Sequence, residues 1–230
     1  MSRSAVRAVA AAIASLAIGF AGQPALASFT VPPNRPAAYA PRDTCVKTPA
    51  ARAFVARLRN AVAQHNARAL ADLAAPDIRL DFGGGGGKAL LRSQLASAEG
   101  PALWRELSEA VGLGCAMSNG DMAFPWLFAQ NLGDADPFDA YVVTGPAVPL
   151  YRRANAGSGP IARLNWQLVI ARGEGLAPDI DKRSMRHISV INSSLEGYVA
   201  SNRLRSVIGH RLIVSRHGPT WEITAFVAGD

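Results

Sequence analysis

The stretch AYVVTGPAVPLYRR, residues 140–153, decides how the rest of the chain is divided. Its apolar residues alternate with polar or small ones over short runs, and a Gly-Pro pair separates the runs, which is typical of short strands. The runs LNWQLVIA, RHISVI and EGYVA follow, separated by the turn-rich pieces ANAGSGP and GEGLAPD. Several short strands at this spacing predict a small β-barrel over residues 140–206.

The same segment carries the whole excess of positive charge found in residues 28–230. Residues 140–206 contain 9 basic and 4 acidic residues, whereas residues 28–139 contain 11 of each and residues 207–230 two of each. An excess in one segment indicates a module with its own surface. A basic face attracts anions, which on a cell envelope are peptidoglycan carboxylates, lipopolysaccharide phosphates or an acidic protein. A surface that only keeps the protein soluble has the same composition.

Two helices are predicted on the N-terminal side of this segment. Pro49 suits the first position of a helix, and Phe54, Leu58 and Val62 fall on one of its faces. The run ALADLA predicts a short second helix, which Pro76 ends.

Strands and a further helix complete the flanks of the barrel segment. IRLDF (residues 78–82) alternates like a strand with Phe82 facing inward, and PALWRELSEAVGL (residues 101–113) predicts a helix. The last 21 residues, HRLIVSRHGPTWEITAFVAGD, alternate on both sides of a turn and predict a terminal hairpin.

The glycine run in DFGGGGGKALLRSQL (residues 81–95) does not form a nucleotide-binding motif. A Walker loop needs glycine where this chain has Phe82 and Ser or Thr where it has Ala89, and the last glycine of a dinucleotide motif would fall on Lys88. Free amides at a helix start can hold an anion. The run predicts a turn between a strand and a helix that begins near Lys88.

Residues 140–206 resemble a bacterial Src homology 3-like domain. The similarity lies in VTG (143–145), PLYRR (149–153), the small residues 156–159 and GYV (197–199). The family generally has a tryptophan, often part of its ligand platform, where this chain has His187. The resemblance implies a small barrel that binds peptidoglycan or peptides and brings a catalytic partner to them.

The flanking segments resemble the nuclear transport factor 2-like fold, a cystatin-like cone. FVARLRNAVAQHNARALADLAAPDIRLDF (54–82) is similar to its opening helices and first strand, and RLIVSRHGPTWEITAFVAGD (211–230) to its terminal hairpin. The resemblance implies an α+β fold in which the barrel is inserted into a cone-like domain made of residues 45–139 and 207–230. Cone-fold domains form ligand pockets or enzymes such as ketosteroid isomerase, which needs a tyrosine and two carboxylic acids. Outside residues 140–206 the only tyrosine is Tyr39, in the leader, so that set of residues is missing.

The N-terminal 27 residues have the features of a signal peptide. Arg3 and Arg7 precede an apolar run over residues 8–20, and ALA at residues 25–27 predicts cleavage before Ser28. A leader with four prolines, residues 28–44, is expected to be extended. No later apolar run approaches 18 residues, which predicts a periplasmic or secreted protein without a transmembrane anchor. Export removes nucleic acid and ATP from its partners.

Two cysteines, Cys45 and Cys115, are present. In an oxidising compartment they predict a disulfide, which would stabilise the fold by about 4 kcal/mol in the chain-entropy model. The alternative makes Cys115 a nucleophile, as in secreted cysteine peptidases. It would need a downstream histidine and a position at a helix start, which GLGCAMSNG does not supply.

No catalytic or metal motif is present in the sequence. The four histidines lack metal-ligand spacing, and neither HExxH nor GxSxG occurs. No cofactor and no metal are therefore predicted, and a non-catalytic protein is expected. A carboxylate and an imidazole at strand ends, Asp81 and His210, would be the pair for acid–base chemistry if they met.

Three functions follow from these features. The favoured one is an exported binding protein whose basic barrel engages an envelope polymer or peptide through Tyr151, Arg152, Arg153, Trp166 and Tyr198. The second is a small-ligand carrier or sensor with an apolar pocket in the cone-like part, lined by Trp104, Phe124 and Trp126. The third is a hydrolase or isomerase that uses Asp81 and His210 in that pocket. The aromatic residues are also reasonable core residues.

Overall fold

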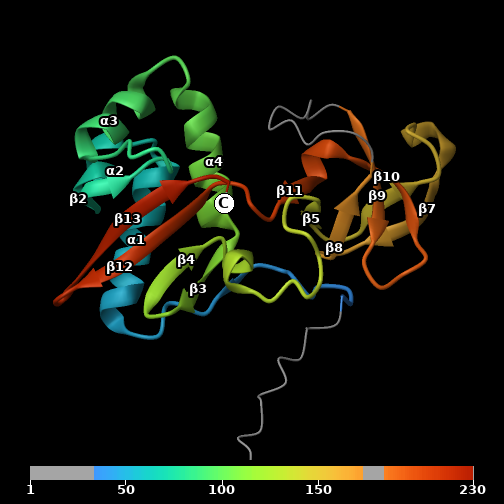
Figure 1. Ribbon diagram of the computed structural model, residues 1–230, viewed down its shortest axis with the longest axis horizontal. Helices are drawn as coiled ribbons and strands as arrows, with labels where there is room; N and C mark the ends of the chain where they lie inside the picture. Colours follow the sequence, from blue (N-terminus) through green and yellow to red (C-terminus); the bar gives the residue numbers. More distant parts are fainter. Residues whose placement is uncertain (1–33, 173–183, 230) are drawn as a thin grey trace, which may run out of the picture. The chain divides into compact units, whose positions relative to one another are not determined.

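The computed structural model describes residues 34–172 and 184–229 and shows an α+β fold with two separate sheets (Figure 1). The predicted signal peptide and its cleavage site lie outside the described residues. Within the described ranges, no helix is long and apolar enough to cross a membrane.

The first sheet has six strands in the order β1-β3-β4-β12-β13-β2. Their bounds are β1 Arg42–Asp43, β2 Ala74–Arg79, β3 Gly114–Ser118, β4 Asp121–Phe124, β12 Arg211–His217 and β13 Thr220–Val227. The terminal hairpin β12–β13 pairs with β4 on one side and, in parallel, with β2 on the other. It belongs to this sheet because its alternate residues Leu212, Val214 and Ile223 are buried in the core under the helices.

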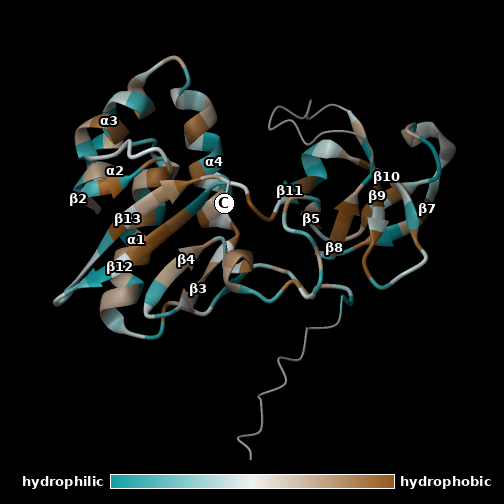
Figure 2. Cartoon of the chain, in the orientation of Figure 1, coloured by the Kyte–Doolittle hydropathy of each residue, from teal (hydrophilic) through white to brown (hydrophobic). Residues whose placement is uncertain are grey.

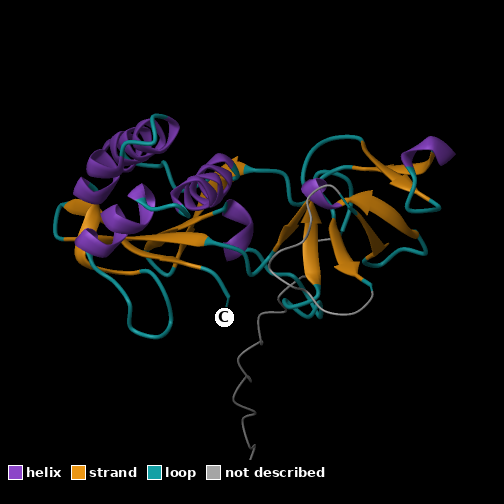
Figure 3. Cartoon of the chain, turned by 90° about the horizontal axis from the view of Figure 1, so that it is seen from above, coloured by secondary structure: helices purple, strands orange, loops and turns teal. Residues whose placement is uncertain are grey.

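Four helices pack on the six-stranded sheet (Figure 3): α1 Pro49–Ala63, α2 Ala67–Asp72, α3 Lys88–Ala96 and α4 Gly100–Gly112. The Thr48 hydroxyl accepts a hydrogen bond from the Ala51 amide and caps α1, with Pro49 at its first position. Phe54, Leu58 and Val62 form the buried face of this helix, as their spacing predicted. Hydrophobic residues of the helices and the sheet thus meet in one core (Figure 2).

The chain between α2 and α3 differs from its predicted form. Helix α2 ends at Asp72, and Pro76 lies within β2. Proline is accommodated there because β2 is at the edge of the sheet, where a missing amide donor breaks no ladder. The strand ends at Arg79, so Phe82 is not an inward strand residue: it lies in the glycine turn and is 57% exposed.

The second sheet has seven strands in the order β11-β5-β8-β9-β10-β6-β7, and all its pairings are antiparallel. The bounds are β5 Ala140–Val143, β6 Val148–Tyr151, β7 Pro160–Leu164, β8 Leu168–Ala171, β9 Met185–Val190, β10 Glu196–Ala200 and β11 Leu204–Ser206. Short 3-10 turns are η1 Trp126–Ala129, η2 Ala156–Ser158 and η3 Ser201–Arg203. All seven strands therefore lie in the sequence between β4 and β12 of the first sheet.

Alternate residues of the second sheet face a separate core. Leu150, Ile188 and Val199, from three neighbouring strands, are fully buried there with Val143, Val148, Leu164, Val169 and Val190. Their sequence neighbours on the same strands point to the opposite face, because side chains alternate along a strand. This alternation decides which polar and aromatic residues of the segment reach the surface.

The described part of the leader is fixed to the protein. The Asn34 side chain donates to the Leu168 and Ile191 carbonyls, at 2.9 and 2.8 Å, and accepts from the Leu168 amide at 2.9 Å. Residue Tyr39 is buried against Leu168 and Val142 in a third apolar cluster. The expected extended leader is therefore, from Asn34 on, a packed segment that precedes β1.

A disulfide joins Cys45 to Cys115, as the sequence predicted, and both residues lie in the core of the first sheet. Since the Cys115 sulfur is bonded to Cys45, it is not a free thiol, and the alternative of a catalytic nucleophile is wrong. The neighbouring Gly114 has a φ of 79°, and a Cβ there would lie 2.2 Å from the Arg42 carbonyl oxygen. Glycine is needed at this position because β1 approaches β3 so closely.

Candidate functional site

A row of polar and aromatic side chains crosses the outer face of the second sheet. Tyr151 on β6 is paired with Tyr198 on β10, and Tyr198 is paired with His187 on β9. The imidazole of His187 stacks on the Tyr198 ring with 4.8 Å between the ring centroids. All three residues are half-buried, so part of each side chain remains open to solvent.

Arg172, which directly follows β8, extends the row by one position. Its amide donates to the His187 carbonyl at 2.9 Å, and its Nε donates to the Ser189 hydroxyl at 3.0 Å. The hydroxyl holds the guanidinium on the same face as the imidazole. We call Tyr151, Tyr198, His187 and Arg172 the outer row; with neighbours about 5 Å apart, it extends about 15 Å.

Exposed arginines surround the outer row. Arg152 and Arg153 follow Tyr151 directly and are exposed, and Arg163 is exposed on β7, beside β6. In the described part of residues 140–206 the charged residues are seven arginines and a single acid, Glu196. These arginines are Arg152, Arg153, Arg163, Arg172, Arg186, Arg203 and Arg205. Arg205 is buried against α4, whereas Arg152, Arg153, Arg163 and Arg172 lie beside or in the row. The face therefore suits a partner that carries several negative charges and has flat or apolar groups to pack on the rings.

The structure places the predicted barrel residues in two groups. Tyr151, Tyr198, Arg152 and Arg153 lie together at the outer row, whereas Trp166 packs in the third cluster, where its carbonyl accepts from the Tyr39 amide. The two row members that the sequence did not assign to the site are His187 and Arg172. The signal for His187 was that it stands where the Src homology 3-like family generally has a tryptophan. Arg172 lies next to a turn-rich stretch, and no sequence signal marked it.

The aromatic residues predicted to line a pocket in the cone-like part are packed in the protein interior. Trp104 and Phe124 belong to the core under the helices, and Trp104 stacks on His65. Trp126 is buried, and the guanidinium carbon of Arg42 lies 4.8 Å from its ring centroid. These side chains line neither of the two hollows described below.

Asp81 and His210 have different partners. The Asp81 carboxylate accepts from the Gly85 amide at 2.7 Å and stabilises the glycine turn. The His210 Nδ1 lies 3.4 Å from a Glu106 carboxylate oxygen, and its ring stacks on Phe226. Among the described residues, no three His, Cys, Asp or Glu side chains are grouped so as to hold a metal ion.

A charged cluster links α4 to the second sheet. Arg205 on β11, only 4% exposed at its side chain, lies 3.0 Å from Glu109 and 3.9 Å from Glu106, both on α4. Its Nη2 also donates to the His210 carbonyl at 2.6 Å. Each contact compensates the buried guanidinium, so this arginine serves the fold rather than the basic surface.

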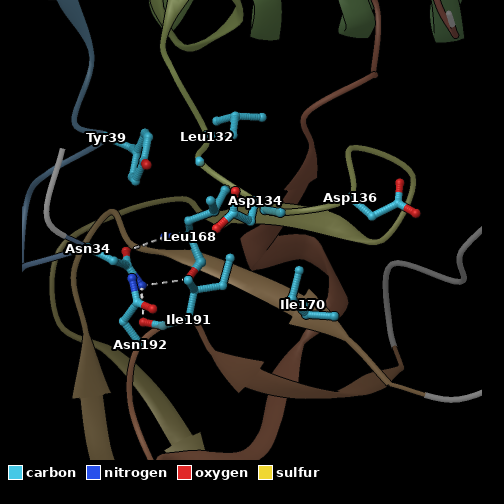
Figure 4. Close-up of a pocket in the computed structure, with 11 residues that line it drawn as sticks. Asn34, Tyr39, Leu132, Asp134, Asp136, Leu168, Ile170, Ile191 and Asn192 are labelled. Atoms are coloured by element: carbon cyan, nitrogen blue, oxygen red, sulfur yellow. Dashed lines mark hydrogen bonds between the residues drawn. The ribbon is translucent and has the colours of Figure 1, made fainter. Parts of the chain in front are cut away.

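Two hollows adjoin the third cluster. The larger, about 340 Å³, is lined by Asn34, Tyr39, Leu132, Gly133, Asp134, Ala135, Asp136, Leu168, Ile170, Ile191 and Asn192 (Figure 4). The smaller, about 180 Å³, is lined by Leu127, Phe128, Leu132, Pro137, Val207, Ile208 and Arg211. Burial raises the pKa of the Tyr39 phenol in the first hollow, so its hydroxyl stays protonated at neutral pH.

These features define the class of protein: an α+β protein that presents a basic sheet face crossed by a row of rings. No family model matches the chain, and no curated protein matches it. Among solved structures, it is similar to one titled Rd1NTF2_05 with five substitutions, at 11% sequence identity and a TM-score of 0.29. The alignment covers 78% of this chain and 96% of that chain. A TM-score of this size does not define a shared fold.

Proposed function

We propose that the protein is an exported, non-catalytic binding protein of the cell envelope, which engages peptidoglycan or another anionic polymer or peptide. The outer row carries the proposal: two tyrosines and a histidine stand opposite one another on three neighbouring strands, continued by an arginine and flanked by exposed arginines. Rings that remain half-exposed on a sheet provide a surface for apolar faces, and the arginines supply bonds to carboxylates or phosphates.

In this proposal, residues 140–206 form a Src homology 3-like barrel inserted into a cone-like domain made of residues 45–139 and 207–230. The antiparallel second sheet with its own core supports the first part, and the return of the chain to the first sheet at β12 supports the second. The Cys45–Cys115 disulfide supports export, because disulfides persist in oxidising compartments. The proposal places signal peptide cleavage near Ala27.

Binding to peptidoglycan is expected to depend on salt and on the arginines beside the row. Purified sacculi should pellet the oxidised protein at low salt and pellet much less at about 0.15 M salt, where exposed charges more than about 8 Å apart are screened. The Arg152→Ala, Arg153→Ala variant should lose most of the remaining pelleting. A matched control removes the same charge from the helices, Arg57→Ala with Arg92→Ala, since both arginines are exposed there.

Equal losses in the two double variants would show that only net charge matters and would remove the second sheet from the proposal. The absence of pelleting at either salt concentration would exclude peptidoglycan as the partner. The same pair of variants can then be tested against lipopolysaccharide and an acidic peptide.

The rings of the row are expected to contribute independently of charge. Tyr198 stands opposite Tyr151 in the sheet and stacks on His187, so Tyr198→Ala should weaken sacculus binding roughly tenfold. Tyr198→Phe keeps the ring and should bind nearly as wild type. Co-sedimentation at several sacculus concentrations measures both. Tight binding by the alanine variant, with an unchanged circular dichroism spectrum, would exclude the row as the contact surface.

A further inference from the structure

A second binding site, separate from the outer row, lies in the hollow of about 340 Å³ beside the third cluster. Its volume falls within the range of small-molecule sites, roughly 300–1,000 Å³. Figure 4 shows the side chains that form it: Leu168, Ile170 and Ile191 from the second sheet, Leu132 from the opposite loop, and Tyr39 from the packed leader. These five residues give the hollow an apolar floor.

Three hydrogen bonds fix the wall of this hollow. The Asn34 side chain joins the leader to both β8 and the residue after β9, through the Leu168 and Ile191 backbone groups. Both hydrogens of this amide are donated within the protein, and its oxygen accepts from the Leu168 amide, so these bonds hold the leader in place. The site is therefore preformed, and its occupation does not have to order the wall.

The polar groups of the hollow are acidic or neutral. Its lining includes Asp134 and Asp136 and no lysine, arginine or histidine, although the chain as a whole has a net charge of +7. The Asp136 carboxylate accepts from the Phe138 amide at 2.9 Å and is occupied in its own turn. Within the described residues, the Asp134 carboxylate, which is exposed at the mouth of the hollow, has no hydrogen bond or ion pair (Figure 4).

The Tyr39 hydroxyl is the second polar group without a partner. Residue Tyr39 is 4% exposed and lines the hollow, and its hydroxyl makes no hydrogen bond to any described residue. The ring is buried while the residue lines the hollow, so a ligand atom there would be within reach of a hydroxyl that no described residue occupies. The hydroxyl can accept from an ammonium group while the ring packs on an apolar body.

We propose that this hollow binds a small organic amine with an apolar body. The ammonium group would pair with the Asp134 carboxylate and donate to the Tyr39 hydroxyl, and the body would lie on Leu132, Leu168, Ile170 and Ile191. The acidic lining selects cations locally within a basic protein, so its ligand has the opposite charge to the partner of the outer row. The two sites can then be occupied independently.

Isothermal titration of the exported, oxidised protein with 2-phenylethylamine tests the site, and 2-phenylethanol serves as the neutral ligand of similar shape. The amine should bind about three- to fivefold more tightly than the alcohol, because an ion pair with an exposed carboxylate adds a modest amount to the apolar contact. Asp134→Asn should remove that difference, and Tyr39→Phe should weaken amine binding several-fold. Asp77→Asn is the matched control, since this exposed aspartate lies on β2 of the first sheet.

Equal affinity for the two ligands, or an unchanged amine affinity in Asp134→Asn, would overturn the assignment of a cation site. No heat of binding for either ligand at millimolar concentration would overturn the hollow as a site. Both variants replace side chains that line a hollow, and their thermal unfolding should match that of wild type. Sacculus binding by Asp134→Asn should equal that of wild type, which separates this site from the proposed function.

Discussion

Loss of the Cys45–Cys115 disulfide is expected to lower the free energy of unfolding by about 4 kcal/mol. The bond closes a loop between residues 70 positions apart. In the chain-entropy model, it lowers the conformational entropy of the unfolded chain, so the unfolded state becomes less favourable. It also anchors β1 and the start of α1 to β3, where Asp43 pairs with Cys115. Urea unfolding of a Cys45→Ala, Cys115→Ala variant, followed by circular dichroism, measures the loss.

The oxidised wild type in the same buffer is the reference, and a reductant gives a second measurement of the same effect. Cys45 and Cys115 are 2% and 0% exposed, so a reductant should act only when the first sheet opens. Reduction should therefore be slow in native buffer and fast in urea. A loss below about 1 kcal/mol in the double alanine variant would mean that the disulfide contributes little to the stability of this fold.

Removing the two carboxylates that face Arg205 should destabilise the protein by about 3 kcal/mol. In a Glu106→Gln, Glu109→Gln variant, the guanidinium remains buried beside neutral amides, and a buried charge without compensation is costly. This loss is at the lower end of the range expected when a buried ion pair is broken, because the side chains of Glu106 and Glu109 are 29% and 35% exposed. Thermal unfolding and urea unfolding both report the loss.

The reverse change provides the control. Arg205→Met removes the buried charge and leaves two partly exposed carboxylates, so it should cost less than the double glutamine variant. Combining all three substitutions should recover part of the loss, since no buried charge is then left unpaired. Additive losses in the triple variant would show that the three side chains do not act as one cluster.

Local patterns in the sequence were sufficient to predict helix α1 and the disulfide. The spacing of Phe54, Leu58 and Val62 predicted the buried face of α1, and Pro49 predicted where it begins. These signals lie within one or two turns of the chain, so they do not depend on distant contacts. The disulfide followed from an even pair of cysteines in a chain with features of export.

The same local reasoning failed where distant partners decide the structure. Phe82 continues the alternation of β2 in the sequence, but the strand ends at Arg79 and the glycine turn carries the ring to the surface. Trp104 and Phe124 are residue types that can line an apolar pocket, but in this structure they are packed in the core under the helices. Apolar residues occur both in pocket linings and in cores, and only the packing around them distinguishes a lining residue from a core residue.

The α+β class and the disulfide could be read from the amino-acid sequence. So could the position of the basic segment and the presence of the rings of Tyr151 and Tyr198 in that segment. The outer row of Tyr151, Tyr198, His187 and Arg172 exists only because the strands that carry these residues are neighbours in the folded sheet. Likewise, the hollow exists only because Asn34 bonds to Leu168 in the fold. Side-chain alternation is a property of one strand and can be read along the chain. Which strands become neighbours is set by register between segments far apart in the sequence, and no local pattern records it.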